Sequence, residues 1–128
     1  MPVELNHTIV AAREKKASAQ FLADILGLQV GPKYGPFIPV PIPNGVTLDY
    51  MDTTSPITPQ HYAFLVSEDD FDEIFARVQA AGLTYWADPG HHRPHEINTN
   101  DGGRGTYFDD PNGHNLEILT RPYGSGTD

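Results

Sequence analysis

Hydrophobic and polar positions alternate along the first stretch of the chain and then switch to helical spacing. Residues 3–11 alternate and are rich in valine and isoleucine, which predicts a strand that carries His7. Apolar side chains then recur three and four residues apart, at Ala17, Phe21, Leu22 and Ile25. Gly27 is a stop signal, so the pattern predicts a helix from about Glu14 to Leu26. Three extended runs are expected after the helix, over residues 28–34, 37–42 and 46–51.

The same succession begins again after a polar, proline-containing linker. A strand is expected over residues 60–67, with His61 near its start. Ser67 and the three acids after it form an N-terminal capping pattern for a helix that ends at Gly82. The apolar stripe of that helix contains Phe71, Ile74, Phe75 and Val78. The remaining segments are expected to be a strand, a long polar loop, a hairpin and a glycine-rich tail with little to fold around, over residues 83–87, 88–103, 105–120 and 121–128.

These two successions indicate an internal repeat within one domain that spans residues 1–128. Gly27 lies 20 residues after His7, and Gly82 lies 21 residues after His61. The last strands of the halves superpose as Thr47-Leu-Asp-Tyr-Met51 on Asn115-Leu-Glu-Ile-Leu119, which matches Asp49 with Glu117. Each half is therefore expected to be a βαβββ module, module one over about residues 3–52 and module two over about residues 60–121.

The hairpin near the end of the chain contains a carboxylate that needs a partner. Asp110-Pro-Asn-Gly113 is strong turn chemistry, and Glu117 then lies in the middle of an apolar strand. A buried carboxylate is costly unless a positive group lies opposite it, and a metal ion is one such group. The alternative for this stretch alone is a Glu117 that faces solvent on a half-exposed strand.

Composition restricts the partners of the protein. The chain has 128 residues with 38% hydrophobic and 10% aromatic residues, which is typical of a globular domain. Its formal net charge of −9 makes nucleic acid and anionic membranes unsuitable partners. The absence of cysteine excludes disulfides, thiolate metal sites and cysteine nucleophiles, and no apolar run approaches the roughly 18 residues of a membrane span. A cytoplasmic protein is expected.

Three motifs carry a resemblance to a known family: Leu5-Asn-His7, Gln60-His-Tyr-Ala-Phe64 and Tyr107-Phe-Asp-Asp-Pro-Asn-Gly-His-Asn-Leu-Glu117. Together with the repeat, they make the chain from about residue 4 to 121 resemble the vicinal oxygen chelate superfamily. That superfamily includes glyoxalase I, extradiol dioxygenases, fosfomycin resistance enzymes and bleomycin resistance proteins. The resemblance implies an α+β fold in which two βαβββ modules form a half-open mixed-sheet barrel around a central site.

The resemblance also implies a divalent metal ion. The ligands carried over by position are His7, His61 and Glu117, a donor set suited to Fe, Mn, Ni, Co or Zn. Three protein ligands leave positions open for water and for two oxygens of a substrate. Asp49 stands where glyoxalase I has a fourth ligand, a glutamate, and its shorter side chain leaves open whether it binds the metal or acts in catalysis.

Further candidate site residues lie in and around the long loop. Tyr107 precedes Glu117 by ten residues across the hairpin, which suits either a catalytic contact with a substrate oxygen or a packed aromatic ring. His92 and His95 are candidate substrate-binding residues, with a polar surface loop as the alternative. Arg104 is suited to holding a substrate carboxylate, and Trp86 is suited equally to lining a cavity or to the core.

Three functions remain open from the sequence. The first is a metal-dependent enzyme that acts on a small oxygen-chelating molecule by lyase, isomerase or dioxygenase chemistry. The second is a bleomycin-resistance-type binding protein without catalysis, and the third is a thiol transferase that acts on an epoxide antibiotic. The matched histidines and acids favour the first function, because sequestration of a drug requires no metal ligands. A homodimer is expected, since relatives of this type commonly pair.

Overall fold

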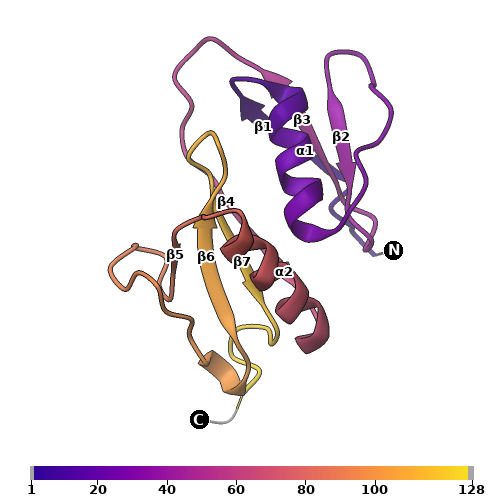
Figure 1. Ribbon diagram of the computed structural model, residues 1–128. Helices are drawn as coiled ribbons and strands as arrows, with labels where there is room; N and C mark the ends of the chain where they lie inside the picture. Colours follow the sequence, from indigo (N-terminus) through magenta and orange to yellow (C-terminus); the bar gives the residue numbers. More distant parts are fainter. Residues whose placement is uncertain (1, 127–128) are drawn as a thin grey trace. The chain divides into compact units, whose positions relative to one another are not determined.

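The protein divides into two compact units, the first ending at Thr58 and the second beginning at Pro59. This computed structural model describes residues 2–126, and each unit is considered by itself (Figure 1). The division falls in the polar linker that separates the two halves of the repeat.

The first unit is a three-stranded mixed sheet with one helix. Its elements are β1 (His7–Ala12), α1 (Lys15–Leu26), β2 (Ile38–Pro41) and β3 (Thr47–Asp52). The sheet order is β1-β3-β2, in which β1 runs parallel to β3 and β2 runs antiparallel to it. Gly27 ends α1 in the left-handed conformation, with φ of 73°, as the sequence predicts. The apolar residues Val10, Leu22 and Val40 are fully buried and form part of the core.

The strand expected over residues 28–34 does not form. Gly31 N–H bonds to Pro39 O at 2.8 Å and Tyr34 forms an isolated bridge with Phe37, but these contacts do not make a continuous ladder. Pro32 has no N–H to donate and Gly31 has no side chain to pack, so the segment cannot sustain a ladder. Module one is therefore βαββ in regular structure, one strand fewer than predicted.

The second unit has the full βαβββ succession. Its helices and strands are β4 (His61–Leu65), α2 (Glu68–Ala80), β5 (Tyr85–Trp86), a 3₁₀ turn (Asn100–Gly102), β6 (Gly105–Asp109) and β7 (Asn115–Leu119). The sheet order is β4-β7-β6-β5, with β4 parallel to β7 and the other pairs antiparallel. Ser67 Oγ accepts a hydrogen bond from Asp70 N at 3.1 Å, which is the predicted N-terminal cap of α2.

The core of the second unit lies between α2 and one face of its sheet, and Figure 1 shows the helix alongside β6 and β7. The helix buries Phe71, Ile74 and Val78, and the sheet buries Phe108, Leu116 and Ile118. Because strand side chains alternate between faces, the burial of Leu116 and Ile118 against the helix directs Glu117 to the opposite face. The site described below is built on that opposite face.

The two modules pair their strands in the same register, which confirms the internal repeat. His7 lies opposite Thr47 and Ile9 opposite Asp49 in module one. His61 lies opposite Asn115 and Ala63 opposite Glu117 in module two. Asp49 and Glu117 therefore occupy equivalent positions in equivalent parallel strand pairs, as the sequence comparison of the halves predicts.

The turn between β6 and β7 forms as the sequence predicts. Gly113 has φ of 88° and its N–H bonds to Asp110 O at 3.1 Å. The Asp110 carboxylate also accepts hydrogen bonds from the backbone N–H groups of Asn112 and His114, at 2.8 and 2.9 Å. This network fixes the turn and hence the register of the strand that carries Glu117.

The expectation of a tail with little to fold around is wrong for the described part of the tail, residues 121–126, while residues 127 and 128 lie outside the described chain. The Asp101 carboxylate accepts hydrogen bonds from Gly124 N and Gly126 N, both at 3.2 Å. A Cβ atom at position 126 would overlap the backbone of Asp101, so the segment lies directly against the 3₁₀ turn. No helix among the described residues is long and apolar enough to cross a membrane.

Candidate functional site

Two rows of side chains cross the helix-free face of the second sheet. Strand pairing defines the first row as Trp86, Tyr107, Glu117 and Ala63. The adjacent row contains Asp109, Asn115 and His61. Paired residues on neighbouring strands share a face, so the register alone brings most of the chemically active side chains of module two together.

His61 and Glu117 meet diagonally on this face. His61 Nε2 lies 3.1 Å from Glu117 Oε1. The His61 side chain is 45% exposed whereas that of Glu117 is 1% exposed, so the pair has one solvent-accessible and one buried member. The sequence predicts both as metal ligands, and the structure places their donor atoms side by side.

The contact of His61 Nδ1 with the protein backbone orients the ring, so that Nε2 faces the Glu117 carboxylate. His61 Nδ1 lies 2.9 Å from the backbone oxygen of Asn115. A carbonyl oxygen only accepts hydrogen bonds, so Nδ1 carries the proton and a neutral ring presents the Nε2 lone pair to Glu117. A lone pair and a carboxylate oxygen at 3.1 Å need a cation between or beside them, either a proton or a metal ion. Metal-binding histidines are commonly oriented by a carbonyl in this way.

Glu117 also accepts a hydrogen bond from the hydroxyl of Tyr123, a contact that the sequence does not predict. Tyr123 Oη lies 2.6 Å from both carboxylate oxygens of Glu117, and Tyr107 Oη lies 2.9 Å from Tyr123 Oη. The carboxylate of Glu117 only accepts, so Tyr123 donates to it and Tyr107 donates to Tyr123. Burial, together with the hydrogen bond to Glu117, raises the pKa of Tyr123 well above its usual value.

Tyr107 lies on the site face, as the hairpin spacing predicts. Its ring stacks on that of His61 at a centroid distance of 5.8 Å, and the residue is 4% exposed. Burial raises the pKa of the Tyr107 hydroxyl, which keeps it protonated at neutral pH. Tyr107 therefore provides a protonated hydroxyl beside the His61–Glu117 pair.

Trp86 extends the site face through His91, a histidine whose place in the site is not predicted by residue spacing. The rings of Trp86 and His91 are parallel, at a centroid distance of 3.7 Å. His91 Nε2 lies 3.1 Å from Asn115 Oδ1 and 3.6 Å from Asp109 Oδ1. Burial raises the pKa of Asp109. Because His91 has φ of 60°, its placement depends on a backbone conformation that residue spacing does not reveal.

His92 and His95 are both exposed. The His92 backbone N–H bonds to the Asp88 carboxylate at 2.9 Å, and the His95 ring packs edge-on against Tyr85. Burial raises the pKa of Asp88, but hydrogen bonds from the backbone of His92 and Arg93 lower it by more. These contacts order the loop, and substrate binding by either histidine stays a prediction.

Arg104 has protein partners for its guanidinium group. Arg104 Nε lies 2.8 Å from Glu68 Oε1, Nη1 lies 2.9 Å from Asp72 Oδ1, and the guanidinium carbon lies 4.4 Å above the Phe71 ring. The hydrogen bond that Arg104 donates to Glu68, followed by the one it donates to Asp72, raises the pKa of Arg104. Arg104 therefore ties β6 to the first turns of α2, and its predicted contact with a substrate remains untested.

The Arg104→Ala variant is expected to lose stability. The change removes two ion pairs and the packing of the guanidinium on Phe71, at a cost of roughly 1 kcal/mol. Thermal unfolding measures this loss against Arg93→Ala, which breaks only the exposed pair with Glu96. A variant with unchanged melting temperature and a raised KM would instead favour the substrate-binding role.

Module one carries the two remaining predicted residues of the site on one face of its own sheet. His7 is exposed, and its Nδ1 lies 2.7 Å from Asn6 Oδ1. Asp49 is half-buried and lies opposite Ile9 and Pro39. Within the described part of either unit, no group of three His, Asp or Glu side chains is arranged to hold a metal ion.

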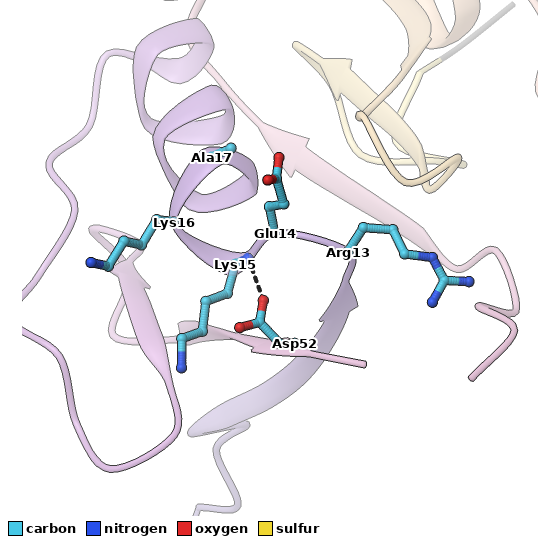
Figure 2. A pocket seen from close by; sticks show the side chains of 6 residues that line it. All are labelled: Arg13, Glu14, Lys15, Lys16, Ala17 and Asp52. Carbon is cyan, nitrogen blue, oxygen red and sulfur yellow. Dashed lines mark hydrogen bonds between the residues drawn. The ribbon is translucent and has the colours of Figure 1, made fainter. Parts of the chain in front are cut away.

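A separate hollow in module one lies at the start of α1 (Figure 2). It is lined by Arg13, Glu14, Lys15, Lys16, Ala17 and Asp52. Lys15 N donates to Asp52 Oδ1 at 2.7 Å, and Arg13 Nη1 donates to the backbone oxygens of Thr53 and Ser55. None of the predicted site residues lines this hollow.

The His61–Glu117 pair fits a divalent metal ion. Two metal–ligand bonds of about 2.1 Å at a right angle place their donor atoms about 3.0 Å apart. The observed separation is 3.1 Å, and His61 Nε2 is turned toward the carboxylate because Nδ1 faces a carbonyl oxygen. Two donors of the predicted set are thus pre-arranged in module two.

Comparison with known proteins identifies the family of the chain. The family model of the Glyoxalase/Bleomycin resistance protein/Dioxygenase superfamily matches residues 4–118. Glutathione transferase FosA from Serratia marcescens is 31% identical over 120 residues, which cover 89% of this chain and 78% of that protein.

Solved structures extend the likeness over nearly the whole chain. Oxidase ChaP-H2 is 79% identical with a TM-score of 0.98, over 99% of this chain and 100% of that one. Oxidase ChaP-H1 is 63% identical with a TM-score of 0.94, over 96% of this chain and 99% of that one. A glyoxalase/dioxygenase from Nostoc punctiforme, at 23% identity and a TM-score of 0.69 over 93% of this chain and 91% of that one, shares the α+β fold. The chain belongs to the Glyoxalase/Bleomycin resistance protein/Dioxygenase superfamily.

Proposed function

We propose that this protein is a divalent-metal-dependent oxidase of a small aromatic substrate that chelates through neighbouring oxygens. The observation that carries the proposal is His61, whose Nδ1 is held by a carbonyl while Nε2 faces Glu117 Oε1 at 3.1 Å. Two histidines and one carboxylate with open positions are typical of non-haem Fe(II) oxygenases. We therefore assign Fe(II) as the first metal to test and Mn(II) as its redox-inactive substitute in binding measurements.

Oxidative chemistry is favoured over the other reactions of the superfamily by the relatives of highest identity described above. Both proteins, at 79% and 63% identity, are named as oxidases. Lyase or isomerase chemistry has no comparable support, since the lactoylglutathione lyase from Agrobacterium tumefaciens is 18% identical and informs on the fold alone.

The side chains of the site favour an uncharged aromatic substrate. Trp86 and Tyr107 supply ring surface in the same row as Glu117. None of the strands β4 to β7 contains a lysine or arginine, so the sheet itself offers no fixed cation for a phosphonate or phosphate group. This composition weighs against a fosfomycin-type thiol transferase, although FosA is 31% identical to the chain.

His7 is proposed as the third metal ligand. It occupies the position in β1 that His61 occupies in β4, and its Nδ1 is likewise paired with an oxygen acceptor. Asp49 is proposed to act near the metal from the position equivalent to Glu117. A homodimer is proposed for the assembly, and sedimentation analysis tests it.

Each residue of the proposed site has its own role in the reaction. When bound, the metal ion would supply Lewis-acid and redox chemistry for a substrate with neighbouring oxygens. His61 and Glu117 hold that ion, and the Asn115 carbonyl keeps the His61 ring turned toward it. Tyr107, buried beside His61, would turn its single hydroxyl proton from Tyr123 Oη to a substrate oxygen as negative charge develops on that oxygen.

The decisive experiment measures metal and oxygen together. Metal-free protein is titrated with Fe(II) without oxygen and with Mn(II) by calorimetry, and the expected result is one ion per chain. The Fe(II) form is then supplied with catechols and other vicinally oxygenated aromatics in an oxygen electrode, where substrate-dependent O₂ uptake is expected. Absence of bound metal would contradict the proposal and favour a bleomycin-resistance-type binding protein.

A further inference from the structure

The described C-terminal segment, residues 121–126, is fastened to Asp101, a residue of the second unit that is remote in sequence, and is tied together by bonds of its own. Asp101 accepts hydrogen bonds from Gly124 N and Gly126 N, and Arg121 Nη2 donates to Ser125 O at 3.4 Å. Ser125 N and Oγ also bond to Pro122 O, at 3.1 and 2.6 Å. These bonds form a compact turn with Tyr123 inside it.

The turn delivers the Tyr123 hydroxyl to the carboxylate of Glu117. Tyr123 Oη lies 2.6 Å from Glu117 Oε1 and 2.6 Å from Oε2, while the residue as a whole is 61% exposed. The ring therefore contributes little to the core, and only its polar end reaches the site. Hydrogen bonds from a hydroxyl to a charged oxygen at this distance are among the strong ones in proteins.

The hydroxyl also links two residues that have separate roles. Tyr107 Oη donates to Tyr123 Oη at 2.9 Å, and Tyr123 donates to Glu117, so one hydrogen-bonded chain runs from the Tyr107 phenol to the carboxylate. A carboxylate that receives a hydrogen bond is restricted in rotation and in how many of its oxygens it offers to a metal. Such outer partners orient metal-binding carboxylates and tune their affinity.

We infer that Tyr123 is a positioning residue of the metal site. It fixes the Glu117 carboxylate so that Oε1 is presented beside His61 Nε2, and it couples that carboxylate to Tyr107. The inference rests on the proposed role of Glu117 as a metal ligand. It assigns a function in the site to the C-terminal segment, with Asp101 as the anchor on which that function depends.

The test compares Tyr123→Phe with the native chain in metal binding. The substitution removes one hydroxyl from a largely exposed ring, so the fold should be retained, and circular dichroism checks this. We expect Mn(II) affinity by calorimetry to fall by about tenfold. The visible absorption of the Co(II) form should also change, because release of the carboxylate alters the coordination of the ion. Tyr34→Phe, at an exposed tyrosine of module one, serves as the matched control.

A second variant tests the anchor without touching the tyrosine. Asp101→Asn keeps a side chain that tolerates the φ of 57° at this position but weakens the acceptor for Gly124 and Gly126. It should shift the Co(II) spectrum in the same direction as Tyr123→Phe. Metal bound by the native chain with unchanged affinity and spectrum in both variants would overturn the inference. Failure of the native chain itself to bind metal would overturn the proposed function.

Discussion

His61→Ala is expected to abolish the stabilisation that Mn(II) gives to the native protein. An ion present at about one hundred times its dissociation constant stabilises a folded protein by about 2.7 kcal/mol. His61 supplies the exposed nitrogen donor of the pre-arranged pair, and alanine leaves Glu117 without its neighbour. Differential scanning calorimetry with and without Mn(II) measures the change as the loss of an upward shift in melting temperature.

His92→Ala is the control for this experiment. His92 is in the same module, but its side chain is 85% exposed and its ring faces Asp88 instead of Glu117. The control should keep the full shift with Mn(II). A His61→Ala protein that is still stabilised by Mn(II) as strongly as the native chain would remove His61 from the ligand set.

Tyr107→Phe is expected to lower kcat by about a hundredfold while metal affinity changes far less. Removing one positioned hydrogen-bond donor to a developing oxyanion typically costs between about 10² and 10³ in kcat. The ring that stacks on His61 is preserved by phenylalanine, so the metal site should remain assembled. Steady-state O₂ uptake by the Fe(II) form measures the rate, and Mn(II) calorimetry measures the affinity.

Tyr85→Phe provides the matched comparison for the loss of a hydroxyl. Tyr85 precedes Trp86 in β5 and packs against Phe75 of α2, on the other face of the same sheet. Its variant should turn over at the native rate. Equal rates for native protein and Tyr107→Phe would reduce Tyr107 to a packed aromatic ring, which is the alternative that its spacing in the sequence leaves open.

Local signals were sufficient to predict the elements that position the site. Gly27 ends α1, Ser67 caps α2 and the Asp110–Gly113 turn sets the β6–β7 hairpin, each through bonds between residues close in sequence. The match of Asp49 with Glu117 came from comparison of the halves, and the strand register confirms it. Helix ends and turns that are fixed by residues close in sequence can therefore be predicted from the sequence.

The features that were missed depend on contacts between distant residues. Tyr123 reaches Glu117 only because Asp101 holds the segment after it, and spacing gives no sign of that bond. The segment over residues 28–34 has a strand-like composition around Gly31 and Pro32, but Pro32 has no backbone N–H to donate to a ladder. His91 enters the site by a positive φ, which no residue pattern indicates.

Arg104 shows that the type of a residue does not reveal which protein groups its side chain will contact. An arginine before a site strand is suited to a carboxylate ligand, yet two carboxylates of α2 already lie within 3 Å of its guanidinium. Glu68 and Asp72 are four residues apart and hence on one face of the helix, and this spacing is the signal in the sequence for a protein partner of Arg104.

The shared register of the two sheets gives this protein an internal reference. Tyr107 lies opposite Glu117 in module two, and Pro39 lies opposite Asp49 in module one. The same backbone pairing thus joins a tyrosine to a glutamate in module two and a proline to an aspartate in module one. The residue at a position of one module is one that the equivalent strand position in the other module accommodates. Exchanging side chains between equivalent positions therefore separates the residues that the strand pairing requires from those that the chemistry requires.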